Sequence, residues 1–367
     1  MRINVLHIVA NGKLSGAEKV VSDICTNIDT EMFHPLVVCT QGELVEHFKS
    51  RHVDCFNADV NKMEISKLRS ILVANKVHII HAHDVKASIA GYLASINLKI
   101  PVISHIHSSY PWMKTKSPLK YIDRFFRNKY TLSIACSQKA AEYYFEYNKS
   151  LDKSKMIVKG NMFNFRELAQ VKLQDEKEMK RKFFIDSDTY VFGYLGRLLE
   201  SKGVDLLIES FYNFSLKNDK AVLLIVGDGE YMDKLKDLVS NYKLEDKVIF
   251  AGYQKDVYSY LNVFDSFILP SRYEGLPISV LEAMAMERVV ISTPTAGVPE
   301  VIDNNYSGIL LKERSMECLL EAMEYVYFNR DKAEEMGKNA KAFLFEHRNI
   351  KNYIVDLQKL YAKISSK

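Results

Sequence analysis

The chain has 367 residues, 47% of them hydrophobic, and a formal net charge of +4. That length exceeds what a single core usually supports, so two domains are expected, and the small net charge gives no reason to expect a nucleic-acid partner. No apolar run approaches the roughly 20 residues that span a bilayer, so any membrane association would be peripheral. The five cysteines follow no CxxC pattern, and the chain enters an apolar strand without a signal peptide, which together favour the reducing cytoplasm.

The first half alternates short apolar strands with helical stretches. Strands are expected at residues 3–9, 35–40, 77–82, 101–105, 132–136 and 156–158, and helices at 17–28, 64–74, 86–96 and 138–147. Such alternation is typical of βαβ units, which form a parallel sheet with helices on both faces. Residues 11–16 form a glycine turn that could cradle phosphate at a helix start, although the turn alone favours an ordinary βα connection.

Residues 163–188 are rich in charge and lack a strong apolar stripe, so we place the domain boundary in this connector. Beyond it the alternation restarts. Strands are expected at residues 190–195, 221–226, 248–251, 267–269, near 290 and at 308–311, and helices at 204–216, 231–242, 257–262, 278–286, 316–328, 332–346 and 351–364. The fold class is therefore α/β, with two doubly wound, Rossmann-like halves that bind ligands beyond the carboxyl ends of their strands.

Several turns at strand ends in the second half carry polar residues. Residues 196–203 read G-R-L-L-E-S-K-G, with Arg197 and Lys202 between two glycines. Two cations in a glycine turn can flank a diphosphate; the alternative is a surface turn with two solvated charges, and the turn alone does not decide. Gly227 and Gly229 follow the next strand and Tyr253 the one after, where each turn is either a tight connection or room for a nucleotide base or ribose.

Residues 271–287 combine two carboxylates with a helix start. Pro277 suits the first turn of a helix from residue 278, so the free N–H groups of that helix face Glu274 in the preceding loop. Glu282 lies about one turn into the helix. Two carboxylates and a positive helix end then share one small volume, which suits phosphate or hydroxyl groups. Because all these turns end strands of one sheet, they predict a site for a nucleotide diphosphate attached to a polyol.

On these motifs the sequence closely resembles glycosyltransferase family 4, a retaining group with the GT-B fold, along essentially the whole chain. The resemblance rests on G-R-L-L-E-S-K-G (196–203), G-D-G (227–229), E-G-L-P-I-S-V-L-E-A-M-A (274–285), T-P-x-x-G-V-P-E (293–300) and S-G-A-E (15–18). It implies an acceptor-binding domain at 1–165, a linker at 166–188, and a donor-binding domain at 189–349 that faces the first across a cleft. A final helix, 350–367, would cross back onto the first domain.

The resemblance also implies roles for single residues of the second domain. Arg197 and Lys202 would bind the donor's diphosphate and neutralise the leaving group. Glu282 would hold the ribose, and Glu274 would contact the donor sugar. The remaining donor-binding residues would be Gly227, Gly229, Tyr253, Gly275, Leu276 and Pro277.

From the first domain, the resemblance implies that Gly16 approaches the phosphate and that His107 contacts the donor sugar when the cleft closes. Such enzymes use no metal and no cofactor, since two cations replace a divalent ion at the diphosphate. One departure concerns the end of the first domain, where the family commonly reads N-G-V-D or N-G-I-D. Asn161 matches, but Met162 and Asn164 replace the glycine and the aspartate, which affects hinge-side contacts and not the donor site.

Two histidine pairs, His81 with His83 and His105 with His107, alternate along strands and so face one side, as metal ligands can. No cysteine or carboxylate cluster completes a site, so we expect cleft lining and no bound metal. His107 is expected to contact sugar and not to act as general base, because the leaving phosphate can itself accept a proton in a retaining transfer. Asp84, next to His83, is an acceptor-side candidate together with Asn161.

Residues 111–129 combine the only tryptophan with a cluster of bases. A helix from Pro118 would bring Leu119, Ile122 and Phe126 together and leave Lys120, Arg124 and Arg127 on other sides. This segment is either a docking surface for an anionic membrane beside a lipid-linked acceptor, or an ordinary amphipathic helix with a solvated basic face.

The sequence thus predicts a metal-independent, retaining hexosyl- or N-acetylhexosaminyl-transferase. It would use a nucleotide diphosphate sugar, with UDP favoured, and a glycan acceptor such as a lipid-linked intermediate of a surface polysaccharide or capsule. The alternative is a catalytically silent subunit that binds nucleotide sugar and supports a partner transferase, but that function predicts eroded contacts, whereas Arg197, Lys202, Glu274 and Glu282 are all present. A nicotinamide oxidoreductase would need a GxGxxG turn, which follows neither domain's first strand.

Overall fold

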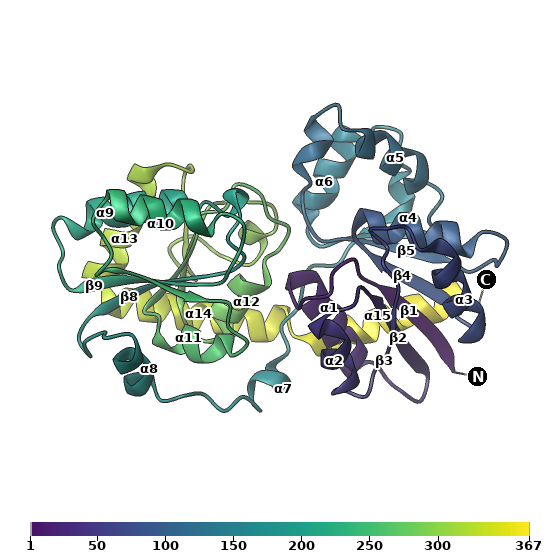
Figure 1. The fold of residues 1–367 in the computed structure, drawn as a ribbon, viewed down its shortest axis with the longest axis horizontal. Helices are drawn as coiled ribbons and strands as arrows, with labels where there is room; N and C mark the ends of the chain where they lie inside the picture. Colours follow the sequence, from purple (N-terminus) through teal and green to yellow (C-terminus); the bar gives the residue numbers. More distant parts are fainter. Residues whose placement is uncertain (1, 367) are drawn as a thin grey trace. The chain divides into compact units, whose positions relative to one another are not determined.

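The computed structural model describes residues 2–366, and the chain divides into two compact units. One unit holds the residues up to Met162 together with those from Asn349 onward, and the other is Phe163–Arg348. Each unit is built on one parallel sheet with helices on both faces (Figure 1), which confirms the predicted α/β fold class. No helix of the described residues is long and apolar enough to cross a membrane.

The first unit has a seven-stranded sheet in the order β3-β2-β1-β4-β5-β6-β7. The strands are β1 (Ile3–Ile8), β2 (Phe33–Cys39), β3 (Asp54–Asn57), β4 (Ile79–His83), β5 (Val102–Ile106), β6 (Leu132–Ala135) and β7 (Met156–Val158). The helices are α1 (Gly16–Asn27), α2 (Glu43–Lys49), α3 (Ile65–Ala74), α4 (Asp84–Ser95), η1 (Pro111–Lys114), α5 (Pro118–Arg127), α6 (Gln138–Tyr147), η2 (Lys153–Lys155) and α15 (Ile350–Ser365).

Alternate residues of the central strands of this unit enter two separate cores. Leu6 and Ile80 pack with the apolar residues of α3 and α4, whereas Val37 packs with Val21 of α1 and Phe48 of α2 on the opposite face. Helix α15 packs against α1 and β4, so the end of the chain belongs to this unit. With both faces covered, the strands need near-continuous apolar sequences, which is why they could be recognised.

The second unit has a six-stranded sheet in the order β10-β9-β8-β11-β12-β13. The strands are β8 (Tyr190–Leu195), β9 (Ala221–Val226), β10 (Val248–Gly252), β11 (Ser266–Leu269), β12 (Val289–Ser292) and β13 (Ile309–Leu310). The helices are α7 (Phe165–Leu168), α8 (Glu176–Lys182), η3 (Glu200–Lys202), α9 (Val204–Ser215), α10 (Met232–Asn241), α11 (Val257–Val263), α12 (Ile278–Ala285), η4 (Val298–Glu300), α13 (Met316–Phe328) and α14 (Arg330–His347).

The structure departs from the sequence interpretation in two places. The stretch 166–188, expected as a linker, is packed on the second unit: α8 contacts α11, and Met179 and Ile185 lie in that unit's core. The interpretation also missed α2 and β3. Strand β3 is a four-residue edge strand that reads D-C-F-N, so it has no apolar run to reveal it.

Each sheet has a topological switch point, where two neighbouring strands send their connections in opposite directions and leave a crevice beyond their carboxyl ends. In the second unit this point lies between β8 and β11; the loops that follow these strands contain Arg197, Lys202 and Glu274. In the first unit it lies between β1 and β4, and Gly16 and Asp84 begin the helices that follow these strands. The strand order therefore brings these five predicted residues to the switch points of their units.

Candidate functional site

Lys202 and Glu274 form an ion pair at the switch point of the second unit. Lys202 Nζ lies 2.7 Å from Oε1 and 2.9 Å from Oε2 of Glu274, and Ser271 Oγ donates to the same Oε1 at 2.7 Å. The side chain of Glu274 is 7% exposed and that of Lys202 is 23% exposed. The carboxylate is thus the buried anchor of the pair, and the ammonium is its accessible end.

Glycines allow the loops around this pair to pack backbone against backbone. Gly203 has φ of +71°, and a Cβ built on it would lie 2.2 Å from the carbonyl oxygen of Pro270. Gly227 has φ of +141°, and its Cβ would lie 1.9 Å from the carbonyl oxygen of Gly196. Both contacts are far shorter than any Cβ tolerates, so the turns after β8, β9 and β11 keep their arrangement only with glycine at these positions.

The other predicted donor-side residues lie in the same unit but differ in exposure. Arg197 is exposed, and its guanidinium has no partner among the residues that the structure describes. Glu282 is buried on α12, which begins at Ile278 as predicted, with Pro277 as the residue before its first turn. Tyr253, just after β10, is 47% exposed. The structure therefore joins Lys202 to Glu274 and leaves the Arg197 side chain free for a ligand.

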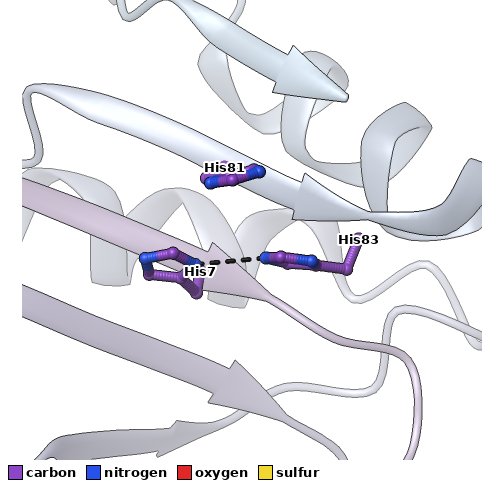
Figure 2. Close-up of side chains that lie close together, drawn as sticks. All are labelled: His7, His81 and His83. Atoms are coloured by element: carbon purple, nitrogen blue, oxygen red, sulfur yellow. Dashed lines mark hydrogen bonds between the residues drawn. The ribbon is translucent and has the colours of Figure 1, made fainter. Parts of the chain in front are cut away.

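Five histidines line one face of the first unit's sheet. His7 on β1 is in register with His81 on β4, and His83 on β4 is in register with His105 on β5. These four are fully buried, and His107 after β5 is half-buried. Figure 2 shows His7 and His83 meeting edge to edge, with His81 beside them. The sequence interpretation named the pairs on β4 and β5 but missed His7, whose place beside His81 depends on the crossover between β1 and β4.

Hydrogen bonds link three of these imidazoles into a chain. His7 Nδ1 lies 3.1 Å from His83 Nε2, and His83 Nδ1 lies 2.9 Å from His107 Nε2. His81 Nδ1 instead pairs with the hydroxyl of Tyr361 on α15 at 2.6 Å. Burial lowers the pKa of His7 to about 3 and lowers the pKa of His81 and His83 well below the usual value. These rings are therefore neutral at physiological pH.

The same histidines form two overlapping triads in which the ring nitrogens lie within 4.8 Å of one another: His7, His81 and His83, and His83, His105 and His107. Their rings are mostly stacked; the planes of His81 and His105 differ by 10° and those of His105 and His107 by 25°. The absence of a metal requirement stays a prediction.

The other predicted residues of the first unit are engaged with their neighbours. Asp84 begins α4 with φ of +70°, accepts a hydrogen bond from the hydroxyl of Tyr110, and lies 3.4 Å from the backbone nitrogen of His107. Gly16 is the first residue of α1. Asn161 is buried. The acceptor-side roles of Asp84 and Asn161 remain predictions.

Helix α5 corrects one expectation about the basic segment. Arg127 is fully buried; its guanidinium pairs with Asp123 one turn earlier, donates to Ser104 Oγ at 2.7 Å, and lies 4.9 Å from the centre of the Tyr144 ring. The prediction that Arg127 lies outside the core was therefore wrong. A partner at position i−4 and two aromatic walls satisfy the charge inside the unit.

The outer face of α5 is apolar and basic. Tyr121, Ile122 and Phe125 are 57%, 44% and 63% exposed. Arg124 and Lys129 are exposed beside them, and Lys129 Nζ lies 4.4 Å from the centre of the Phe125 ring. This combination is typical of helices that lie on an anionic membrane surface.

Comparison with known proteins places these features in context. The family model described as Glycosyltransferase Family 4 matches residues 14–161, and the model described as Glycosyl transferases group 1 matches residues 175–343. An Escherichia coli UDP-Gal:alpha-D-GlcNAc-diphosphoundecaprenol alpha-1,3-galactosyltransferase is 23% identical over 98% of this chain and 97% of its own length. An uncharacterized glycosyltransferase of Methanocaldococcus jannaschii is 32% identical, over 53% of this chain and 51% of its own.

Among solved structures, the Anabaena protein HepE in complex with UDP and glucose matches with a TM-score of 0.88 and 19% identity, over 98% of this chain and 100% of that one. Two parallel Rossmann-like units, each with its polar residues at the switch point, define the GT-B class of folds. The chain belongs to the glycosyltransferases, with a Family 4 first half and a group 1 second half.

Proposed function

We propose that this glycosyltransferase moves a hexose or N-acetylhexosamine from a UDP sugar to a lipid-linked glycan, with retention of anomeric configuration. The observation that carries the proposal is the Lys202–Glu274 ion pair at the switch point, with the unpartnered Arg197 in the loop after the same strand. The Escherichia coli relative is a UDP-galactose-dependent enzyme with a diphosphoundecaprenol acceptor, and HepE was solved with UDP and glucose, which supports both the donor and the acceptor class.

The ion pair explains how Lys202 can meet a diphosphate in a fixed direction. An ammonium group has three N–H donors, and two of them point to the two oxygens of Glu274. The third is left for a phosphate oxygen. Glu274, held in turn by Ser271, thus orients the cation in addition to any contact with the sugar. The ammonium group then needs little reorientation when negative charge develops on the diphosphate during the reaction.

In the proposed reaction, the bond between the sugar's anomeric carbon and the phosphate oxygen breaks while a bond to the acceptor oxygen forms on the same face. Negative charge grows on the leaving diphosphate, where Lys202 and Arg197 stabilise it in the place of a divalent ion. The acceptor's hydroxyl proton passes to the leaving phosphate. Glu282 holds the ribose hydroxyls of the donor. No resident metal or cofactor takes part.

The experiment that tests the donor is slow hydrolysis of nucleotide sugars without acceptor. UDP sugars are expected to be turned over in preference to GDP sugars, with release of UDP and of a sugar whose anomeric form, followed by NMR, is the same as in the donor. Equal turnover of GDP sugars would refute the base assignment, and an inverted product would refute retention. Addition of EDTA should leave the rate unchanged.

The exposed face of α5 is the membrane-docking surface in this proposal. Replacing Tyr121 and Phe125 together with serine should weaken binding to vesicles that contain phosphatidylglycerol by roughly tenfold or more, since two aromatic side chains lose their burial in the lipid interface. Because both side chains are exposed, the fold should be unaffected. Co-sedimentation with vesicles at low and high salt measures the effect.

The matched control is Phe184→Ser, which removes an aromatic side chain that is 97% exposed in the other unit. This variant should bind vesicles as the unaltered protein does. If the double variant of α5 also binds as well as the unaltered protein, α5 does not dock on the membrane.

A further inference from the structure

The hydrogen-bonded chain His7–His83–His107 couples the proton positions of its three rings. A neutral imidazole has one N–H donor and one lone pair, so a ring that donates at one nitrogen must accept at the other. His83 uses both nitrogens within the chain, at 3.1 Å and 2.9 Å. The protons of all three rings therefore point together, either from His7 toward His107 or in the opposite direction.

The surroundings of His7 choose between these directions. Its Nε2 is buried and has no hydrogen-bond partner among the described residues. If the hydrogen bonds were donated from His107 toward His7, Nε2 of His7 would carry a buried N–H without an acceptor, an arrangement that is rare in proteins. If the hydrogen bonds are donated from His7 toward His107, the same nitrogen carries only a lone pair. The second direction places the free N–H on the half-buried His107 and not on the enclosed Nε2 of His7, so it is the more stable one.

We propose that His7 and His83 hold His107 in the Nδ1–H tautomer, so that His107 offers substrate a hydrogen-bond donor and cannot act as a general base. In this arrangement the lone pair of His107 Nε2 accepts from His83 Nδ1–H. Nδ1 of His107 has no partner among the described residues, and the nearby Asp84 carboxylate accepts from Tyr110 and from the backbone N–H of His107. The recipient would be a hydroxyl or phosphate oxygen of a substrate.

The inference deepens the proposed function and rests on it for the identity of the substrate oxygen; the tautomer itself does not depend on activity. His7 and His83 are positioning residues, since they act through His107. The arrangement differs from a metal site because each of the two links joins a pair of nitrogens that face each other at hydrogen-bond distance, with one proton between them.

The test is direct observation of the tautomer in the full chain labelled with ¹⁵N-histidine. Two-bond ¹H–¹⁵N spectra distinguish Nδ1–H from Nε2–H, and His107→Gln identifies the signals of His107. We expect the Nδ1–H form in the unaltered protein and in His83→Asn, whose amide can donate from nearly the same place. We expect a loss of that form in His83→Leu. An Nε2–H form in the unaltered protein would overturn the proposal, even if His83→Leu does not fold.

Transfer kinetics supply a second readout. His83→Leu should lower turnover roughly tenfold, the size of one lost orienting hydrogen bond, while His83→Asn restores most of it. His34→Asn is the matched control, because His34 lies in the same unit and pairs with Asp54 near the surface; it should leave turnover unchanged. Equal losses in His83→Asn and His83→Leu would contradict a positioning role. A protein with the expected tautomer but no transfer from UDP sugars would refute the proposed function alone.

Discussion

Replacing Lys202 with methionine is expected to lower the turnover of sugar transfer by roughly 10²–10³-fold, the loss typical when one fixed partner of a developing charge is removed. Methionine keeps the length and the apolar stem of the side chain but cannot stabilise charge on the leaving diphosphate. Because that charge grows in the transition state, kcat should fall much more than KM rises. Steady-state transfer with purified variants, alongside thermal unfolding, measures both effects.

Two further variants separate the role of Lys202 from the general effect of losing a lysine–carboxylate ion pair. Lys247→Met removes a similar pair in the same unit, in which Lys247 Nζ lies 3.0 Å from Asp219 Oδ1 at the surface; it should keep full turnover. Glu274→Gln keeps the shape of the carboxylate but loses the charge that holds Lys202, so its turnover should fall less than that of Lys202→Met. Unchanged turnover in a folded Lys202→Met protein would mean that this residue does not act on the leaving group.

The positions of the residues expected on the donor side could be predicted from the sequence, because these residues follow apolar strands. Arg197, Lys202 and Glu274 stand in turns directly after β8 and β11, and the apolar runs of these strands are readable in the sequence. The sequence interpretation assigned Lys202 to diphosphate and Glu274 to sugar without pairing them. The pair exists because β8 and β11 are neighbours, and neighbours at a switch point are not consecutive in the chain. No local pattern reveals such a contact.

His7 was missed because its neighbouring strand is also not consecutive in the chain, whereas Arg127 was placed wrongly for a different reason. His7 stands in the first strand and meets β4 only through the sheet order; its one visible signal was a histidine inside an otherwise apolar strand. Arg127 was placed outside the core because a charged side chain usually faces water. The structure satisfies this charge internally with Asp123 and Ser104. The contact with Ser104 on β5 is a tertiary one that helical periodicity cannot predict, whereas the pairing with Asp123 is local to the helix.

Acidification from pH 7.5 to 5 is expected to unfold the first unit before the second. Burial lowers the pKa of His7 to about 3, while in the unfolded chain it returns to about 6.5. Below pH 6.5 His7 therefore binds a proton in the unfolded chain but not in the folded chain, and the free energy of unfolding decreases as the pH falls, down to about pH 3. His7 alone costs about 2 kcal/mol of stability at pH 5. The lowered pKa values of His81, His83 and His105 add to this loss.

The groups that face these rings do not cancel the effect. Tyr361 on α15 stays neutral because burial raises its pKa. Asp84 and Glu18 oppose the effect of burial only at His107. Fluorescence of Trp112, the only tryptophan, reports on the first unit and gives its urea midpoint at each pH.

The decisive variant is His105→Leu, because both nitrogens of His105 are buried without a hydrogen-bond partner among the described residues. Leucine loses no hydrogen bond there and binds no proton when the chain unfolds. The variant should therefore be no less stable than the unaltered protein at pH 7.5 and clearly more stable at pH 5. A urea midpoint that shifts between the two pH values by the same amount in both proteins would show that His105 does not contribute to acid unfolding. Since burial is the main reason that the folded chain keeps these rings neutral, such a result would also require the histidine row to be open to water.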